Sequence, residues 1–416
     1  MFVLLRRYIA SGSVLFFSAT SQLAAFAILA RALGIQQMGA VILITAVTTL
    51  AASACGLGAS DTIVRGLARD RRRYPELVGH GLTLIGGTGI ALTIVSTAAL
   101  VLLFRMSQVA EESWTTFLFF SIANIPLFAL VTFVERIFIG RQDFVRANLV
   151  NMGQALVRLA TTVAACLLFQ VTTLSDWAVW LVAGQGIAAA FCGAMLVRGG
   201  RPVWRVDWGE LRLGIHYTTP FFVDALRENA DRLTLGLIVP SSVIGAYGTA
   251  MRMGQMSQIV VHSLNRIVYP LSAGQIHRGT VTAMGMARVY GLAIVGLSIV
   301  TGALVFLVAP ILPILLGAEY ARVVTDLRIV CWLIVPIAIQ TVPYDLLGAI
   351  DQHARRASVY NSLSLVGLVV TVVAILAAGL IGAFVAAYLV QTMLALGLWV
   401  AFRQTVARGA AGQLTG

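Results

Sequence analysis

The sequence contains no lysine, and only 11% of its 416 residues are charged, against about 25% in an ordinary soluble domain. A P-loop needs a lysine that reaches the terminal phosphates of a nucleotide, so ATP hydrolysis at a site of that kind is excluded. The four cysteines lie inside apolar runs without metal-ligand spacing, and the five histidines are scattered. We therefore expect no metal site, no cofactor and no catalytic residues.

What the chain has in excess is apolar sequence. Hydrophobic residues make up 59% of it, and the mean hydropathy is +0.90. A membrane-spanning helix needs about 20 apolar residues, and the sequence has room for about twelve of them. We therefore predict an all-α polytopic membrane protein. The expected spans lie near 9–30, 39–63, 78–104, 115–139, 148–170, 177–197, 214–239, 243–268, 289–309, 326–349, 358–378 and 382–402.

Two similar segments lie 210 residues apart, at 141–151 and 351–361. Internal repeats of this kind are typical of transporters. We predict two six-helix lobes, at 1–200 and 201–416, related by a pseudo-twofold axis along the membrane normal, with a short cytoplasmic tail after the second. The matching pairs are Gln142 with Gln352, Arg146 with Arg356, Ala147 with Ala357 and Asn151 with Asn361.

Arginine is distributed unevenly among the predicted connectors. Most of it falls on the side of the N-terminus, including Arg71, Arg72, Arg73, Arg141 and Arg355. The positive-inside rule then places both termini of this multi-pass membrane protein in the cytoplasm. This bias also accounts for the net charge of +12, so we expect no nucleic-acid partner. No connector is long enough to hold a glycosyltransferase or ligase site, and we expect no enzyme.

The seventh predicted span carries five ionisable residues, Asp224, Arg227, Glu228, Asp231 and Arg232. Each would cost about 2.5 to 3.5 kcal/mol at the bilayer centre. Helical spacing predicts the ion pairs Arg227–Asp231 and Glu228–Arg232. We expect these side chains to face a wet cavity between the halves and to contact substrate. The alternative is that the ion pairs only lock helices together.

Four residues on neighbouring spans complete the predicted site. Arg252 and Gln255 lie in the eighth span, and Asp61 and Arg65 end the second. We predict substrate contacts for Arg65, Arg227, Arg232, Arg252 and Gln255. Asp61, Asp224, Glu228 and Asp231 are the predicted cavity or coupling acids. For Arg65 the alternative is that it only begins the basic turn that ends at Arg73.

A family resemblance rests on several short motifs. They are Ala230-Asp231-Arg232-Leu233 with Gly236, Gly245-Ala246-Tyr247 with Ala250 and Arg252, Leu316-Gly317-Ala318-Glu319-Tyr320 before Leu327-Arg328, Tyr360-Asn361, Gly379-Leu380-Ile381-Gly382-Ala383, and the weaker Arg31-Ala32-Leu33-Gly34 with Gly39. Taken together, these motifs resemble those of the oligosaccharide flippases of the multidrug/oligosaccharidyl-lipid/polysaccharide exporter superfamily, and the resemblance implies a place in the bacterial inner membrane.

The resemblance implies a flippase that moves undecaprenyl-diphosphate-linked oligosaccharides by alternating access, for surface polysaccharide such as the lipopolysaccharide O-antigen or an exopolysaccharide. It assigns Arg227, Arg232 and Arg252 to the phosphates or to acidic sugars. It assigns Asp224, Glu228 and Asp231 to holding these arginines or to binding a coupling cation. The expected partners are the lipid-linked oligosaccharide, membrane lipids, and a polysaccharide polymerase with chain-length proteins.

Two other functions are weighed against this one. A cation-coupled multidrug antiporter of the same superfamily would have a mostly apolar cavity with one or two acids, and the arginines of the seventh and eighth spans argue against it. A polysaccharide polymerase or ligase would need a long outer loop with catalytic side chains, and the sequence has none.

Overall fold

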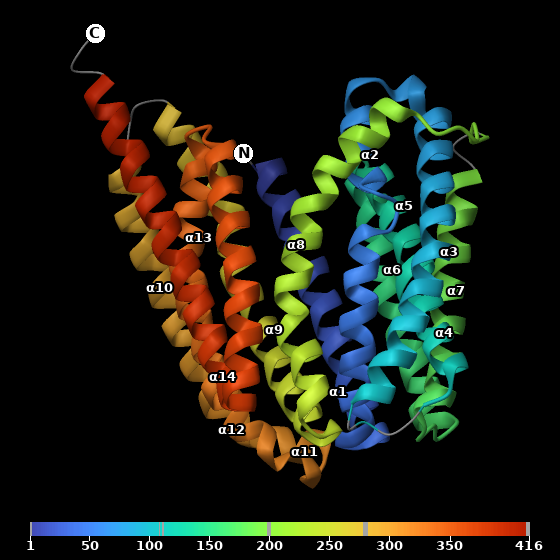
Figure 1. Ribbon diagram of the computed structural model, residues 1–416. Helices are drawn as coiled ribbons and strands as arrows, with labels where there is room; N and C mark the ends of the chain where they lie inside the picture. Colours follow the sequence, from blue (N-terminus) through green and yellow to red (C-terminus); the bar gives the residue numbers. More distant parts are fainter. Residues whose placement is uncertain (1, 108, 110–111, 198–200, 278–281, 413–416) are drawn as a thin grey trace. The chain divides into compact units, whose positions relative to one another are not determined.

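The computed structural model describes residues 2–107, 109, 112–197, 201–277 and 282–412, and all regular structure among them is helical (Figure 1). The α-helices are α1 (Phe2–Ala54), α2 (Ala59–Arg69), α3 (Tyr74–Met106), α4 (Trp114–Ile122), α5 (Phe128–Gly140), α6 (Phe144–Val163), α7 (Leu174–Val197), α8 (Trp208–Ile238), α9 (Ser241–His277), α10 (Ala283–Val308), α11 (Leu312–Leu316), α12 (Ala321–Val330), α13 (Ile334–Ala349) and α14 (His353–Gly412). Short 3-10 or π segments are η1 (Arg71–Arg73), η2 (Ala123–Leu127), η3 (Ala164–Leu168), η4 (Ala309–Ile311), η5 (Ala318–Tyr320) and η6 (Cys331–Leu333).

The helices account for the twelve predicted spans. Eight helical segments of the described chain are long and apolar enough to cross a membrane, and two of them, Phe17–Arg69 and His353–Arg408, have 53 and 56 residues. Each of these two has room for two passes, because one pass takes about 20 residues. The remaining two passes are α8 and α9, with 31 and 37 residues. The all-α, twelve-helix prediction is confirmed.

Glycine breaks divide the two long segments. Gly34 inside α1 has a φ of 77°, and Gly379 inside α14 has a φ of 57°. Positive φ is open to glycine at little cost because it has no Cβ. Both glycines belong to the sequence motifs singled out above, and both lie between two predicted spans. The motifs therefore mark turns of the chain.

The described residues form two compact units, Met1–Gly245 and Ala246–Gly416. The first unit contains all of α8, and the division falls within the first turns of α9. The division into repeats at 1–200 and 201–416, and the axis that relates them, stay predictions.

Within the first unit, alternate connectors gather at opposite ends of the helices. At one end, Gln37 Nε2 donates to the Thr172 carbonyl at 2.8 Å, and Ser241 Oγ donates to the Gln36 carbonyl. At the other end, Arg71 Nη2 donates to the Arg141 carbonyl at 3.1 Å. This is the arrangement that successive antiparallel passes require. The second end holds the basic turn Arg71–Arg73 and Arg141, and its cytoplasmic position stays a prediction.

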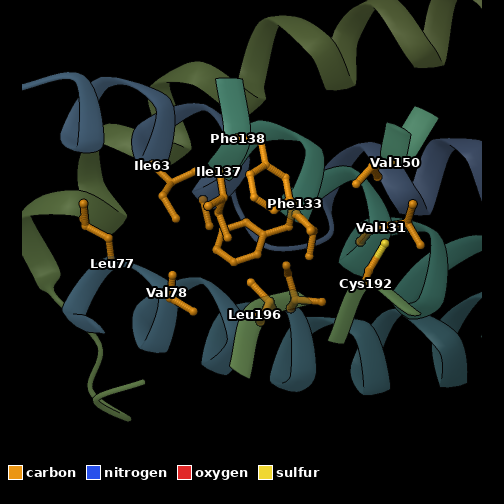
Figure 2. Close-up of a cluster of buried hydrophobic side chains, with 14 of the residues drawn as sticks. Ile63, Leu77, Val78, Val131, Phe133, Ile137, Phe138, Val150, Cys192 and Leu196 are labelled. Atoms are coloured by element: carbon orange, nitrogen blue, oxygen red, sulfur yellow. The ribbon is translucent and has the colours of Figure 1, made fainter. Parts of the chain in front are cut away.

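One buried apolar cluster of the first unit packs α2, α3, α5, α6 and α7 together (Figure 2). At its centre Phe133 is fully buried, and Ile63 and Val78 are 1% exposed. Large apolar residues of other helices are exposed instead, such as Leu292 at 79% and Val289 at 70% on α10. In a bilayer, close packing holds helices together while exposed apolar side chains face lipid.

The basic turn of each half has the same backbone hydrogen bonds. The left-handed residue is Gln142 (φ 62°) in the first unit and Asp351 (φ 58°) in the second. The next N–H bonds back across the turn, from Asp143 to the Phe138 carbonyl at 2.9 Å and from Gln352 to the Leu347 carbonyl at 2.8 Å. This pattern is a Schellman helix end.

The backbone repeat therefore differs by one residue from the sequence register. The sequence match pairs Gln142 with Gln352, whereas the structure places Asp351 in the position of Gln142. The constant register expected from the sequence is wrong at this turn. Aspartate tolerates the left-handed conformation better than most residues, so the second helix ends where Asp351 can adopt it.

Candidate functional site

The predicted charge stripe lies on α8, which is continuous from Trp208 to Ile238. Asp207 caps this helix, because its Oδ1 accepts hydrogen bonds from the backbone N–H groups of Gly209 at 2.8 Å and Glu210 at 3.2 Å. Pro220 lies inside the helix without ending it. All five predicted charges of the stripe therefore share one rigid helix in the first unit.

Two acidic residues contact Arg227, one before it and one after it in the sequence. Its Nη2 lies 2.7 Å from Asp224 Oδ1, its Nε donates to the same oxygen at 3.3 Å, and its Nη2 lies 3.6 Å from Glu228 Oε1. The Arg227 side chain is 8% exposed, against 34% for Asp224 and 52% for Glu228. The Arg227 guanidinium is therefore buried, and the carboxylates of Asp224 and Glu228 are the exposed part of this cluster.

Arg232 takes a different partner from the one expected. Its Nη1 donates to Asn229 Oδ1 at 3.1 Å, and Asn229 Nδ2 donates to the Ala225 carbonyl at 2.7 Å. Glu228 pairs with Arg227, and within the described chain no carboxylate lies at ion-pair distance from Arg232. The predicted Glu228–Arg232 ion pair is therefore wrong, because a neutral acceptor one turn earlier binds the guanidinium.

Arg232 is therefore held by a hydrogen bond to a neutral side chain, and Glu228 acts on it electrostatically without forming an ion pair. Its Nε is buried and has no hydrogen-bond partner among the described residues. Asp231 is buried at 8% exposure, and its Oδ1 accepts the Arg232 backbone N–H at 2.7 Å. Arg232 is half-buried, and a partly desolvated cation without an ion pair is costly, so this residue is the strongest candidate on α8 for binding an anion.

Arg65 lies in a charge network at the basic end of the first unit. Its Nη2 is 3.8 Å from Glu210 Oε2. Arg73 Nη1 is 3.1 Å from Glu210 Oε1, and Arg73 Nη2 is 3.3 Å from Asp207 Oδ2. The structure therefore groups Arg65 with the basic turn, as its alternative interpretation proposed.

This network is remote from the stripe. At a rise of 1.5 Å per residue, Glu210 and Arg227 are about 25 Å apart along α8. Asp61, the other predicted residue of α2, is half-buried. A direct contact of Arg65 or Asp61 with the substrate stays a prediction.

Arg252 and Gln255 lie on the part of α9 that belongs to the second unit. Arg252 is half-buried and Gln255 is exposed. Their grouping with the α8 residues, and the cavity expected between the halves, stay predictions.

Sequence reasoning missed an interior polar network in the first unit. Ser18 Oγ on α1 donates to Asn151 Oδ1 on α6 at 2.6 Å, and Glu135 on α5 interacts with the Asn151 side chain. Arg136 follows Glu135, and Arg158 lies further along α6. These ionisable residues lie within predicted spans, so the rule that singled out α8 would have found them.

The second unit contains a comparable acid. Asp345 on α13 accepts a hydrogen bond from the Tyr290 hydroxyl at 3.1 Å. Glu135 and Asp345 are separated by the same 210 residues as Gln142 and Gln352. Among the described residues, no group of three His, Cys, Asp or Glu side chains could hold a metal ion. The site chemistry is therefore that of arginines, carboxylates and amides.

Comparison with solved structures gives the fold. An inward-facing multidrug resistance MATE family transporter of the MOP superfamily aligns with a TM-score of 0.76 and 15% identity over 94% of this chain and 95% of that chain. A MOP superfamily transporter from Pyrococcus furiosus, described as having a binding pocket of reverse polarity that suggests a different function, aligns with a TM-score of 0.65 and 14% identity over 97% and 95%. A mutant of a Vibrio cholerae MATE transporter gives a TM-score of 0.64 and 14% identity over 97% of both chains.

No curated protein is significantly similar in sequence. A family model described as "Polysaccharide biosynthesis protein" matches residues 4–274, well over half of the chain. The chain shares the twelve-helix, two-lobe fold of the MOP transporters, and its long apolar helices make it a multi-pass membrane protein. The chain belongs to the polysaccharide biosynthesis protein family.

Proposed function

We propose that the protein is a flippase that moves undecaprenyl-diphosphate-linked oligosaccharides across the bacterial inner membrane by alternating access, for lipopolysaccharide or exopolysaccharide synthesis. The observation that carries this proposal is Arg232, a cation of a membrane helix that hydrogen-bonds to the neutral Asn229 and forms no ion pair among the described residues. The family description, polysaccharide biosynthesis, supports this substrate class. Arginine suits a diphosphate because its planar fork binds two phosphate oxygens at once.

The residues of α8 take different roles in this proposal. Arg232 binds the diphosphate or an acidic sugar, and Arg252 and Gln255 assist from α9. Asp224 and Glu228 hold Arg227, which limits its direct contact with an anion. Asp231, beside Arg232 and buried, is the preferred coupling acid. Asp61 and Arg65 act near the basic end.

The transport needs no nucleotide. An anionic substrate that moves outward is driven by an inside-negative membrane potential, at about 2.3 kcal/mol per charge per 100 mV. Both termini lie in the cytoplasm in this proposal, as the arginine bias indicates. The protein then delivers its substrate to a polymerase with chain-length proteins, and membrane lipids surround it.

A cation-coupled multidrug antiporter is the second candidate. It is supported by the similarity of the fold to transporters described as multidrug MATE proteins. Arg232 argues against it, because a guanidinium at the site repels a cationic drug.

Complementation of a deletion strain separates the two functions. Arg232→Ala and Arg252→Ala should abolish long-chain surface glycan at normal membrane levels of protein, whereas Arg212→Ala, an exposed arginine of the same helix, should complement. Drug resistance should not change with any variant. Full glycan from both site variants, or resistance that depends on them, would favour the antiporter.

A further inference from the structure

An aromatic and charged cluster lies where α13 ends and α14 begins, in the second unit. The Arg356 guanidinium carbon lies 4.4 Å from the centre of the Tyr344 ring. The Tyr344 and Tyr360 rings meet edge to face, with their centres 5.5 Å apart at 65°. Arginine over an aromatic face and edge-to-face rings are both favourable arrangements. Both rings pack against the apolar core of this unit.

Asp345 adds a carboxylate beside the rings. Tyr290, which is 2% exposed, donates its hydroxyl hydrogen to Asp345 Oδ2 at 3.1 Å. Arg356 acts on Asp345 electrostatically, yet the two form no ion pair within 4 Å in the described part of the chain. The cluster therefore holds a hydrogen-bond acceptor and a hydrogen-bond donor that do not form an ion pair with each other.

The cluster is reachable from outside the protein. Tyr344, Asp345, Arg356 and Tyr360 are all half-buried. A carboxylate in a membrane helix is expensive and usually has a function. The neighbouring Arg355 is used differently, because its Nη1 donates to Thr405 Oγ1 at 2.9 Å and its Nη2 donates to Gln404. Only one of the two adjacent arginines therefore joins the cluster.

We propose that Tyr344, Asp345, Arg356 and Tyr360 bind a pyranose ring of the transported oligosaccharide. A sugar ring has C–H faces that pack against aromatic rings, and hydroxyl groups that donate to a carboxylate while accepting from a guanidinium. Binding sites of this kind combine aromatic surface with a few placed polar groups. This inference rests on the proposed flippase function, and it assigns the saccharide to residues of the second unit.

The experiment compares two ligands with the purified full-length protein. One is the lipid-linked oligosaccharide extracted from cells of the source organism that lack this gene. The other is undecaprenyl diphosphate, which has no sugar. Binding of each is measured by native mass spectrometry in detergent.

For the sugar-bearing ligand, Tyr344→Leu with Tyr360→Leu should weaken binding about tenfold, which is what the loss of two stacking contacts predicts. Arg356→Gln should weaken it as well, whereas Tyr344→Phe keeps the ring and should bind like wild type. None of these changes should alter binding of undecaprenyl diphosphate. Arg355→Gln is the matched control and should change neither affinity.

Two failures are distinguishable. If wild type binds both ligands and the cluster variants lose neither or both equally, the saccharide site is wrong and the flippase proposal stands. If wild type binds neither ligand, the proposed function fails, and the saccharide site fails with it. Arg356→Gln changes a half-buried side chain and decides the outcome should the double leucine variant misfold.

Discussion

Arg232 Nη1 donates to Asn229 Oδ1 at 3.1 Å, three residues back along α8. Because the amide is neutral, the guanidinium is positioned without losing its charge. In Asn229→Asp the same geometry would form an ion pair and compensate that charge. We expect Asn229→Asp to lower transport about tenfold or more, the loss of roughly one charge-assisted hydrogen bond to the substrate.

The matched control is Asn229→Ser, which retains a neutral acceptor and should lose less activity. Surface glycan is quantified for both variants at equal membrane protein. Equal transport by Asn229→Asp and Asn229→Ser would contradict a role for the net charge of Arg232.

A double-mutant cycle tests whether the Asp224–Arg227 ion pair contributes to stability. Asp224→Asn and Arg227→Gln should each lower the thermal unfolding midpoint, and the double variant should lose less than the sum. Residues that share a charge-assisted contact couple by about 0.5 to 3 kcal/mol. Asp224 is 34% exposed, so we expect the lower half of that range. Additive losses would mean that the Asp224–Arg227 contact contributes nothing to stability.

The network at the basic end predicts that Arg65 and Glu210 act together. Glu210 is 6% exposed and contacts both Arg65 and Arg73. Glu210→Gln should lower thermal stability, because it leaves two arginines without their shared carboxylate. Arg65→Gln has a smaller expected effect, since Arg73 remains paired with Glu210.

Transport decides whether Arg65 also touches substrate. If it is only structural, transport per folded molecule should match in Glu210→Gln and Arg65→Gln. A selective transport defect in Arg65→Gln would instead support the predicted substrate contact.

The structure of the second repeat turn predicts opposite effects on stability for glycine substitutions at Asp351 and Gln352. Asp351 has a φ of 58°, so Asp351→Gly should be neutral or stabilising, by up to about 1 kcal/mol. Gln352→Gly is the control: Gln352 directly precedes α14 and has no positive φ, so glycine relieves no strain there and should destabilise by adding freedom to the unfolded chain. The thermal midpoints of the purified variants are compared. The reverse order would restore the sequence register, in which Gln352 matches Gln142.

Much of the fold can be predicted from the apolar composition and from the glycines that break helices. Apolar length predicts the spans, and Gly34 and Gly379 mark turns that only a residue without a Cβ adopts easily. The charges of α8 are found because they are costly in a membrane. The hydrogen-bond partners of these charges cannot be predicted in the same way, because helical spacing allows both i,i+3 and i,i+4 contacts. In the structure Arg227 contacts Asp224 and Arg232 contacts Asn229, both at i,i+3 spacing.

Contacts between residues far apart in the chain could not be predicted from the sequence either. Nothing near Arg65 indicates Glu210, which approaches only after α8 packs beside α2. The same holds for Ser18 and Asn151, and for Tyr290 and Asp345, which come from separate helices. The register of the two repeat turns depends on which residue adopts the left-handed conformation. Sequence identity between the two halves does not show which residue this is.

Translocation in proteoliposomes tests the central claim most directly. Lipid-linked oligosaccharide from the deletion strain is placed in the membrane, and its appearance in the opposite leaflet is followed with a lectin while a potassium gradient with valinomycin sets the potential. Wild type and Arg212→Ala should translocate it, faster when the potential drives negative charge toward the detected leaflet. Arg232→Ala should be no faster than protein-free liposomes. Translocation by Arg232→Ala at the wild-type rate, or none by wild type, would contradict the account.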